Sequence, residues 1–291
     1  MRVQTFLILF LMGILLAPFV FGHETGEEEP VDVHAENVPV EASFTDSAQL
    51  AEFLSAQSLN VAGIAALILL GAVAYAVRVR PLGGHAKKML FLVILVTSLL
   101  TTAYLAGSTL YLNAASFTQG PVHWHADFEV WNCSEKLDLK DPEGFSNKEG
   151  EELVHEHGDD RVHVEGALLD ETQGQLGYFF KAVGAEWNDE RFGYPTNQGD
   201  VVLPAKGTCN GRPAELQFFL YRIVNPGNAR QWVYKQYKLS PHDAYETVMA
   251  PYGNVPPGDC LIVEFDAVKE RSEHVCSSYA HAIQRGELNG R

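Results

Sequence analysis

The sequence predicts an α+β protein in which a hairpin of two membrane helices precedes an extracytoplasmic domain with a mainly antiparallel sheet. Three observations predict this class. Two apolar runs, residues 59–77 and 89–112, contain no Asp, Glu, Lys or Arg, and each is about as long as a bilayer is thick. All four cysteines follow these runs. The residues after them form several strand-like segments bounded by turns, with few helical segments.

The chain begins with a third apolar run, residues 6–22, preceded by Arg2. This pattern indicates a signal peptide over residues 1–22 with cleavage after Gly22, and an uncleaved first membrane helix is the alternative. Residues 23–57 are predicted to form an acidic extracytoplasmic arm, because residues 23–47 are rich in Glu, Asp and Pro and poor in aromatic residues.

Residues 58–113 are predicted to hold the two membrane helices and a short basic loop. The loop carries the only basic residues between Arg2 and Lys136, namely Arg78, Arg80, Lys87 and Lys88. The positive-inside rule places this loop in the cytoplasm and residues 114–291 outside it. An ion path through the membrane usually contains charged residues, and neither span has one. We therefore interpret the hairpin as an anchor.

Residues 114–291 are predicted to form one His-rich α+β domain. Segments rich in β-branched and aromatic residues predict strands, a segment ending at Gly184 predicts a short helix, and Gly286 marks the end of a longer one. The expected strands are 122–131, 161–165, 215–224 and 260–266, the expected helices 175–184 and 267–286, and the expected loops 139–152 and 185–199. A β-grasp-like arrangement, in which the sheet wraps one helix, is the specific expectation.

The cysteines Cys133, Cys209, Cys260 and Cys276 all lie in this domain. An even number of cysteines outside the cytoplasm predicts two disulfides, and three pairings are open. No CxxC motif is present, so a thioredoxin-like redox site is not indicated.

The charge of the domain limits its partners. From residue 114 onward the chain has 16 Lys and Arg against 28 Asp and Glu. Nucleic-acid binding needs a basic face, so nucleic acid is excluded, and cations, the membrane or a protein partner remain. The chain also has no GxSxG, P-loop, GxGxxG or HExxH motif, which removes the signatures of common hydrolases, nucleotide-binding proteins and zincins.

Five of the eleven histidines fall within residues 123–163, in the segments HWHADFE, HEH and VHVE. Alternate residues of a strand share a face, so His123, His125, Asp127 and Glu129 are predicted to point away from the core. Gly158, Asp159 and Asp160 predict a turn that sets His155 opposite His163 and His157 opposite Arg161, with Glu165 on the same face. If this hairpin lies beside strand 122–131, up to five imidazoles converge with several carboxylates.

Imidazole and carboxylate together suit transition metals, and Zn or Cu is the cofactor we expect. The predicted metal ligands are His123, His125, His155, His157, His163, Glu129 and Glu165. A simpler interpretation is that these histidines lie on the solvated face of a half-buried strand.

Two resemblances accompany these motifs. HWHADFE, read as HxHx3E, resembles half of the cupin metal motif, with His123, His125 and Glu129 as its ligands; the second half is not recognisable. The chain is more similar to a poorly characterised group of secreted or membrane-anchored microbial domains, over about residues 123–266. The shared segments are His123–Glu129, His155–Glu165, Leu176–Phe180 in an LGxFF motif, and Asn254–Asp266. This resemblance implies a shared fold and histidine site, and it implies no activity.

Three functions follow from this pattern. The first is a membrane-anchored domain that binds a transition metal for sensing, storage or delivery. The second is a metalloenzyme of hydrolase or lyase type, in which Glu129, Glu165 or Asp127 serves as general base at an open metal position. The third is a non-catalytic envelope interaction protein with incidental histidines, or a pH sensor. The first is our hypothesis.

Overall fold

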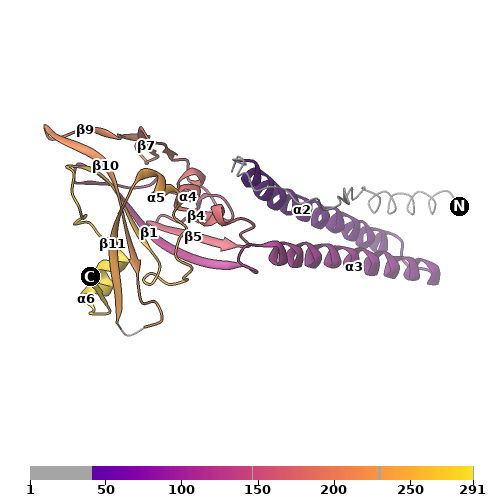
Figure 1. The fold of residues 1–291 in the computed structure, drawn as a ribbon. Coiled ribbons are helices and arrows are strands. Elements are labelled where there is room, and N and C mark those ends of the chain that lie inside the picture. The colour runs from indigo at the N-terminus through magenta and orange to yellow at the C-terminus, as the bar shows by residue number, and fades with distance from the viewer. Residues whose placement is uncertain (1–40, 146, 229–230, 291) are drawn as a thin grey trace, which may run out of the picture. The chain divides into compact units, whose positions relative to one another are not determined.

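The structure is a computed structural model that describes residues 41–145, 147–228 and 231–290 (Figure 1). The predicted signal peptide, residues 1–22, and the first part of the predicted arm lie outside the described residues. In chain order the helices are α2 (Glu41–Arg78), α3 (Gly84–Ala115), the 3-10 helix η1 (Glu171–Gly174), α4 (Leu176–Ala182), α5 (Pro241–Glu246) and α6 (Ser277–Gln284).

The strands are β1 (Val122–Asn132), β2 (Glu135–Leu137), β3 (Glu149–Gly150), β4 (Val154–Glu156), β5 (Arg161–Gly166), β6 (Glu186–Trp187), β7 (Arg191–Tyr194), β8 (Val201–Pro204), β9 (Lys206–Cys209), β10 (Arg212–Ile223), β11 (Trp232–Leu239), β12 (Cys260–Asp266) and β13 (Leu288–Gly290). These elements confirm the predicted α+β class.

Helices α2 and α3 pack against each other as a hairpin (Figure 1). Residues Gln57–Arg78 and Gly84–Ala115 are long and apolar enough to cross a membrane. Their apolar side chains are turned outward: Leu67, Leu70 and Phe91 are each more than 60% exposed. Water does not favour so much exposed apolar surface, and lipid does.

Helix α2 begins at Glu41, so residues 41–57 of the predicted acidic arm are helical. This stretch contains neither Pro nor Gly and runs directly into the apolar segment, so nothing in it ends the helix. The basic connection is also shorter than expected, because α3 already begins at Gly84 and includes Lys87 and Lys88.

The main sheet has the order β13-β11-β10-β12-β1-β5-β4-β3, with β2 on β1 and β9 on β10. Strands β1 and β12 are parallel, whereas β1 with β5 and β10 with β12 are antiparallel. The antiparallel pairs β1–β5 and β10–β12 therefore meet through the parallel pairing of β1 with β12. In the chain, α4 comes after β5 and before β10. This order agrees with the β-grasp-like arrangement that the sequence predicts. Strands β6, β7 and β8 form a small second sheet.

Both faces of the main sheet are covered. On one face Ala126, Phe128 and Val130 of β1 pack with Phe179 and Phe180 of α4 in the larger core. On the other face a smaller core joins β10 and β12 to α6, where Tyr279 and Ala282 are buried. The alternation predicted for residues 122–131 is confirmed, because Val122 and Trp124 also pack against the larger core, whereas His123, His125, Asp127 and Glu129 are not part of it.

The predicted strands at 122–131, 161–165, 215–224 and 260–266 correspond to β1, β5, β10 and β12, and the short predicted helix corresponds to α4. Three predictions are wrong. The helix expected at 267–286 is confined to Ser277–Gln284, because the carbonyl of Ser272 accepts hydrogen bonds from Tyr221 and Gln236 and holds residues before α6 against the sheet. The loop expected at 139–152 contains β3, and the loop expected at 185–199 contains β6 and β7.

The four cysteines form two disulfides, Cys133–Cys209 and Cys260–Cys276. The first joins the end of β1 to β9 across a sequence separation of 76 residues, and the second ties β12 to the start of α6 across 16 residues. One of the three open pairings is thereby selected.

Candidate metal centre

The candidate site is built on the pairing of β1 with β5. In this antiparallel register His123 lies opposite Glu165, and His125 lies opposite His163. Strand β4 continues the sheet beyond β5, with His155 opposite His163 as predicted. The hairpin of β4 and β5 therefore lies beside β1, which is the arrangement that the histidine convergence requires.

Four of the predicted ligands gather into one group: His123, His125, His163 and Glu165. One donor atom from each lies within 4.8 Å of the other three. His123 Nε2 is 3.0 Å from His125 Nε2 and 3.1 Å from Glu165 Oε1. Two ligands that bind one ion at about 2.0–2.1 Å, at right or tetrahedral angles, lie about 2.9–3.4 Å apart. These two spacings, which in the metal-free chain are those of a hydrogen bond and an ion pair, also fit neighbouring ligands on a single ion.

The group has an exposed side and a covered side. The side chains of His123 and Glu165 are 64% and 43% exposed, whereas that of His163 is 13% exposed. His163 Nδ1 lies 3.9 Å from Glu165 Oε1, on the covered side of the group. An ion can reach the group from solvent at His123 and Glu165.

The segment between α5 and β12 orients His125. The backbone N–H of His125 donates to the carbonyl of Tyr252 at 2.8 Å, and its Nδ1 contacts the carbonyl oxygen of Gly253. A carbonyl oxygen only accepts, so Nδ1 carries the proton and Nε2 presents its lone pair. Such an outer hydrogen bond fixes the tautomer and ring orientation of a metal-binding histidine.

Gly258 allows this segment to lie against β1. A Cβ atom at this position would collide with the carbonyl oxygen of His125. The following residue, Asp259, is fully buried, and its backbone carbonyl accepts from Asp127 N–H at 2.8 Å. Its carboxylate accepts hydrogen bonds from Arg222 and from the N–H of Ala250, which fixes both ends of the segment.

Burial also keeps the central histidines neutral. Burial, helped by the neighbouring His125 and His157 and opposed by Asp159, lowers the pKa of His163 to about 4. Burial and the proximity of His157 lower the pKa of His155 as well. At neutral pH both rings are therefore unprotonated imidazoles, the form that binds metals.

His155 and His157 lie beside the group without joining it. The His155 ring is parallel to that of His163 with centroids 5.7 Å apart, and its Nδ1 is 3.2 Å from the carbonyl oxygen of Glu151. The His157 ring is perpendicular to that of His163 at 4.7 Å, and its Nδ1 is 2.5 Å from the carbonyl oxygen of Asn147. His157 follows the end of β4 and is not paired with Arg161, which instead lies opposite Asp127.

Glu129 lies further along β1, away from the four-residue group. Its carboxylate accepts from Trp131 Nε1 at 2.9 Å and is 3.7 Å from Lys136 Nζ. Burial raises the pKa of Glu129, against the effect of Lys136. Asp127 forms an ion pair with Arg161 at 2.7 Å. The two carboxylates that the cupin resemblance and the enzyme hypothesis invoked on β1 are thus occupied by other partners.

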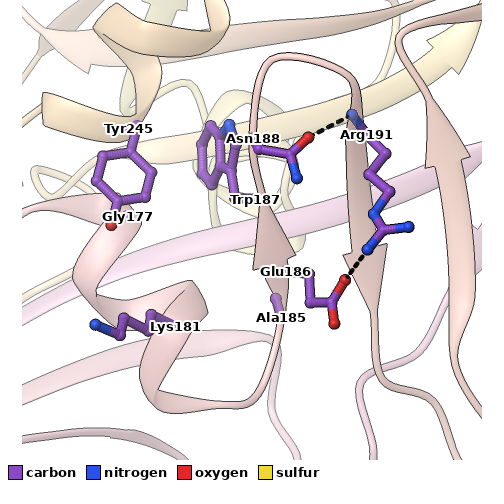
Figure 2. Close-up of a pocket in the computed structure, with 8 residues that line it drawn as sticks. All are labelled: Gly177, Lys181, Ala185, Glu186, Trp187, Asn188, Arg191 and Tyr245. Carbon is purple, nitrogen blue, oxygen red and sulfur yellow. Dashed lines mark hydrogen bonds and ion pairs between the residues drawn. The ribbon is translucent and has the colours of Figure 1, made fainter.

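A separate pocket of about 490 Å³ lies beside α4, lined among others by Trp187, Tyr245 and Arg191 (Figure 2). The Trp187 and Tyr245 rings meet edge to face, and Arg191 forms an ion pair with Glu186 at 2.7 Å. Trp187 also stacks on Phe218 of the larger core, so the pocket is on the opposite face of the sheet from the histidines. None of the predicted metal ligands lines it.

Sequence reasoning missed the segment that orients His125. Residues 250–259 contain three prolines and two glycines, which indicate a turn but not which strand it lies against. The contribution of Gly253 is a backbone carbonyl, and every residue has one, so no side-chain pattern could have marked it.

Comparisons with known protein families, with curated proteins and with solved structures find no match to this chain. The group of His123, His125, His163 and Glu165 is consistent with the HxH and HxE parts of the motif on which the resemblance to microbial anchored domains was based. No family is shown by these comparisons, and the site must be interpreted from its own geometry.

Proposed function

We propose that this protein is a membrane-anchored metal-binding protein whose extracytoplasmic domain, residues 114–291, holds a transition metal through His123, His125, His163 and Glu165. The observation that carries the proposal is the mutual approach of these four donor atoms within 4.8 Å. Three imidazoles and one carboxylate form a ligand set that suits zinc or copper.

Sensing, storage or delivery is favoured over catalysis by the number of donors. Catalytic zinc sites have three protein ligands and keep one position for water or substrate. Here four side chains are available, enough to fill all four positions of a tetrahedral ion. The exposure of His123 and Glu165 in turn supports exchange of the ion with solvent or a partner, which a permanently buried structural ion would not need.

Two features support the anchored, extracytoplasmic placement. Helices α2 and α3 expose apolar side chains and contain spans of membrane length. All four cysteines of the domain are paired in disulfides, which persist in oxidising compartments outside the cytoplasm. The basic residues between the helices would then face the cytoplasm.

The test is the metal content of the full chain, purified in detergent with a tag that contains no histidine. We expect at least one equivalent of zinc or copper per chain, determined by mass spectrometry after metal loading and desalting. The double variant His123→Ala/His125→Ala should lose this metal. The matched control His242→Ala replaces a 71% exposed histidine of α5 and should retain it. A folded wild-type chain that takes up neither metal would refute the proposal.

A further inference from the structure

The ring of His163 faces two different carboxylates. Its Nδ1 lies 3.9 Å from Glu165 Oε1, inside the four-residue group, whereas its Nε2 lies 3.5 Å from Asp159 Oδ2, on the other side of the ring. His163 Nε2 is buried and has no hydrogen-bond partner among the described residues. A buried polar nitrogen without a partner is costly, so this atom calls for a ligand.

His157 precedes the turn that carries Asp159 and contacts the ring of His163. Its Nδ1 approaches the carbonyl oxygen of Asn147 at 2.5 Å, so Nδ1 carries the proton and Nε2 presents a lone pair. Its ring is perpendicular to the ring of His163, with centroids 4.7 Å apart. The ring contact of His157 with His163 and the 3.5 Å approach of Asp159 to His163 bring two imidazoles and a carboxylate to this side of His163.

The turn that carries Asp159 is fixed independently of its side chain. The carboxylate of Glu156 is buried and accepts hydrogen bonds from the backbone N–H groups of Asp159 and Asp160. The Asp159 side chain remains 44% exposed. A rigid backbone with an exposed carboxylate lets Asp159 close on an ion without rearrangement of the hairpin.

We propose that His163 is shared by two divalent metal ions, copper or zinc, and that His157 and Asp159 hold the second. This inference rests on the proposed function, because the first ion is the one held by His123, His125 and Glu165. Binding at both ring nitrogens requires the neutral imidazole to lose its remaining N–H proton. That proton passes to solvent as the second metal–nitrogen bond forms, and the ring becomes an imidazolate.

The charges of the site favour this arrangement. Glu165, Asp159 and the imidazolate each contribute one negative charge against the four positive charges of two divalent ions. Ions on opposite nitrogens of one ring are about 6 Å apart, and the anionic ring lies between them. The excess of acidic residues in residues 114–291 offsets the remaining positive charge.

Copper(II) is the probe for this site, because two copper(II) ions joined by an imidazolate couple their unpaired electrons. The chelator-treated full chain in detergent is titrated with copper(II), with bound copper measured after desalting and the electron paramagnetic resonance signal recorded at each step. We expect two equivalents to bind. The signal should grow up to the first equivalent and then decrease as the second binds.

The variants His157→Ala and Asp159→Asn should each bind one equivalent, with a signal that no longer decreases. Asp159→Asn changes an exposed side chain, so it provides the test if His157→Ala does not fold. His242→Ala should behave as the wild type. One equivalent in the wild type, or a second signal that adds to the first, overturns the shared site and leaves the proposed function standing. No uptake overturns both.

Discussion

Asp259→Asn should weaken both the stability of the domain and its affinity for metal, although Asp259 contacts no predicted metal ligand through its carboxylate. That carboxylate is fully buried and accepts from Arg222 Nε at 2.9 Å, Arg222 Nη2 at 2.6 Å and Ala250 N at 2.9 Å. These bonds hold the segment that runs from Ala250 to Asp259 beside β1. The same segment provides the Gly253 carbonyl that orients His125.

The magnitude follows from these contacts. Breaking a buried ion pair by removing one partner costs about 3–5 kcal/mol. The Arg222 side chain is 35% exposed, so water compensates it in part and we expect about 3 kcal/mol. Loss of an outer hydrogen bond to a ligating histidine lowers metal affinity about 10- to 100-fold. We expect a decrease in that range, because displacement of the segment removes the bond from His125 to Gly253.

Urea unfolding of the metal-free chain, followed by tryptophan fluorescence, measures the first effect. All four tryptophans, at positions 124, 131, 187 and 232, lie after the membrane spans, so the signal reports on this domain alone. Metal titration measures the second effect. The matched control is Glu264→Gln, which breaks another buried carboxylate's contacts with Lys269 and Ser272.

The control should lose comparable stability and keep its metal affinity within about twofold, because Glu264 does not hold the 250–259 segment. If Asp259→Asn loses stability while its metal affinity equals that of the wild type, the segment does not position His125 and the reasoning is refuted.

Three further predictions concern stability. Because burial lowers the pKa of His163 to about 4 from its ordinary 6.5, the folded chain binds this proton more weakly than the unfolded chain. The metal-free protein should therefore lose stability as the pH falls from about 6.5 towards 4, with His163 contributing about 2 kcal/mol at pH 5. Because the pKa of His155 is lowered as well, the urea midpoint of His163→Asn should still fall over this range, but by less than that of the wild type. Replacing Cys133 and Cys209 by serine should cost about 4 kcal/mol in urea unfolding, since this disulfide closes a loop of 76 residues; an unchanged midpoint would contradict the assignment. Gly177→Ala places a Cβ against the ring of Tyr245 and should cost about 1–3 kcal/mol by thermal or urea unfolding, with metal stoichiometry unchanged because this contact lies on the other face of the sheet.

The parts of the site that could be predicted depend on local regularities. The period of two along β1 sets His123 and His125 on one face, and the Gly158–Asp160 turn sets His155 opposite His163. The sequence alone leaves open whether the β4–β5 hairpin lies beside β1. The structure places it there, because β1 and β5 pair over six residues.

Glu129 shows where the period of two is insufficient. It shares a face with His125, but four residues of extended strand separate it from that histidine by about 13 Å. At that distance its surroundings are set by Trp131 and Lys136. Sharing a face is therefore necessary for joining the group, and the register with β5 decides which residues of that face meet.

The helix predicted at 267–286 failed for a different reason. There, tertiary contacts overrule the local helical propensity of the residues before α6. Residues before α6 donate to or accept from side chains of β10 and β11, including Gln217, Tyr221 and Gln236. These partners are 36–52 residues away in sequence, so no local pattern could identify them. Tertiary hydrogen bonds and the Cys260–Cys276 disulfide fix an irregular conformation where the sequence favours a helix.

The distribution of exposure across the four proposed ligands bears on how an ion would leave the proposed site. His125 and His163 are held by the ladder of β1 and β5, and His125 is further fixed by the Gly253 carbonyl. His123 and Glu165 form the exposed side. An incoming ligand from a partner could replace these two one at a time while the other two still bind the ion. Stepwise replacement avoids a fully unligated ion, so exchange through the exposed side would be faster than simple dissociation. Glu165→Gln should therefore accelerate release to a chelator more than His125→Gln does, and equal release rates in both variants would argue for a single, all-or-none exit.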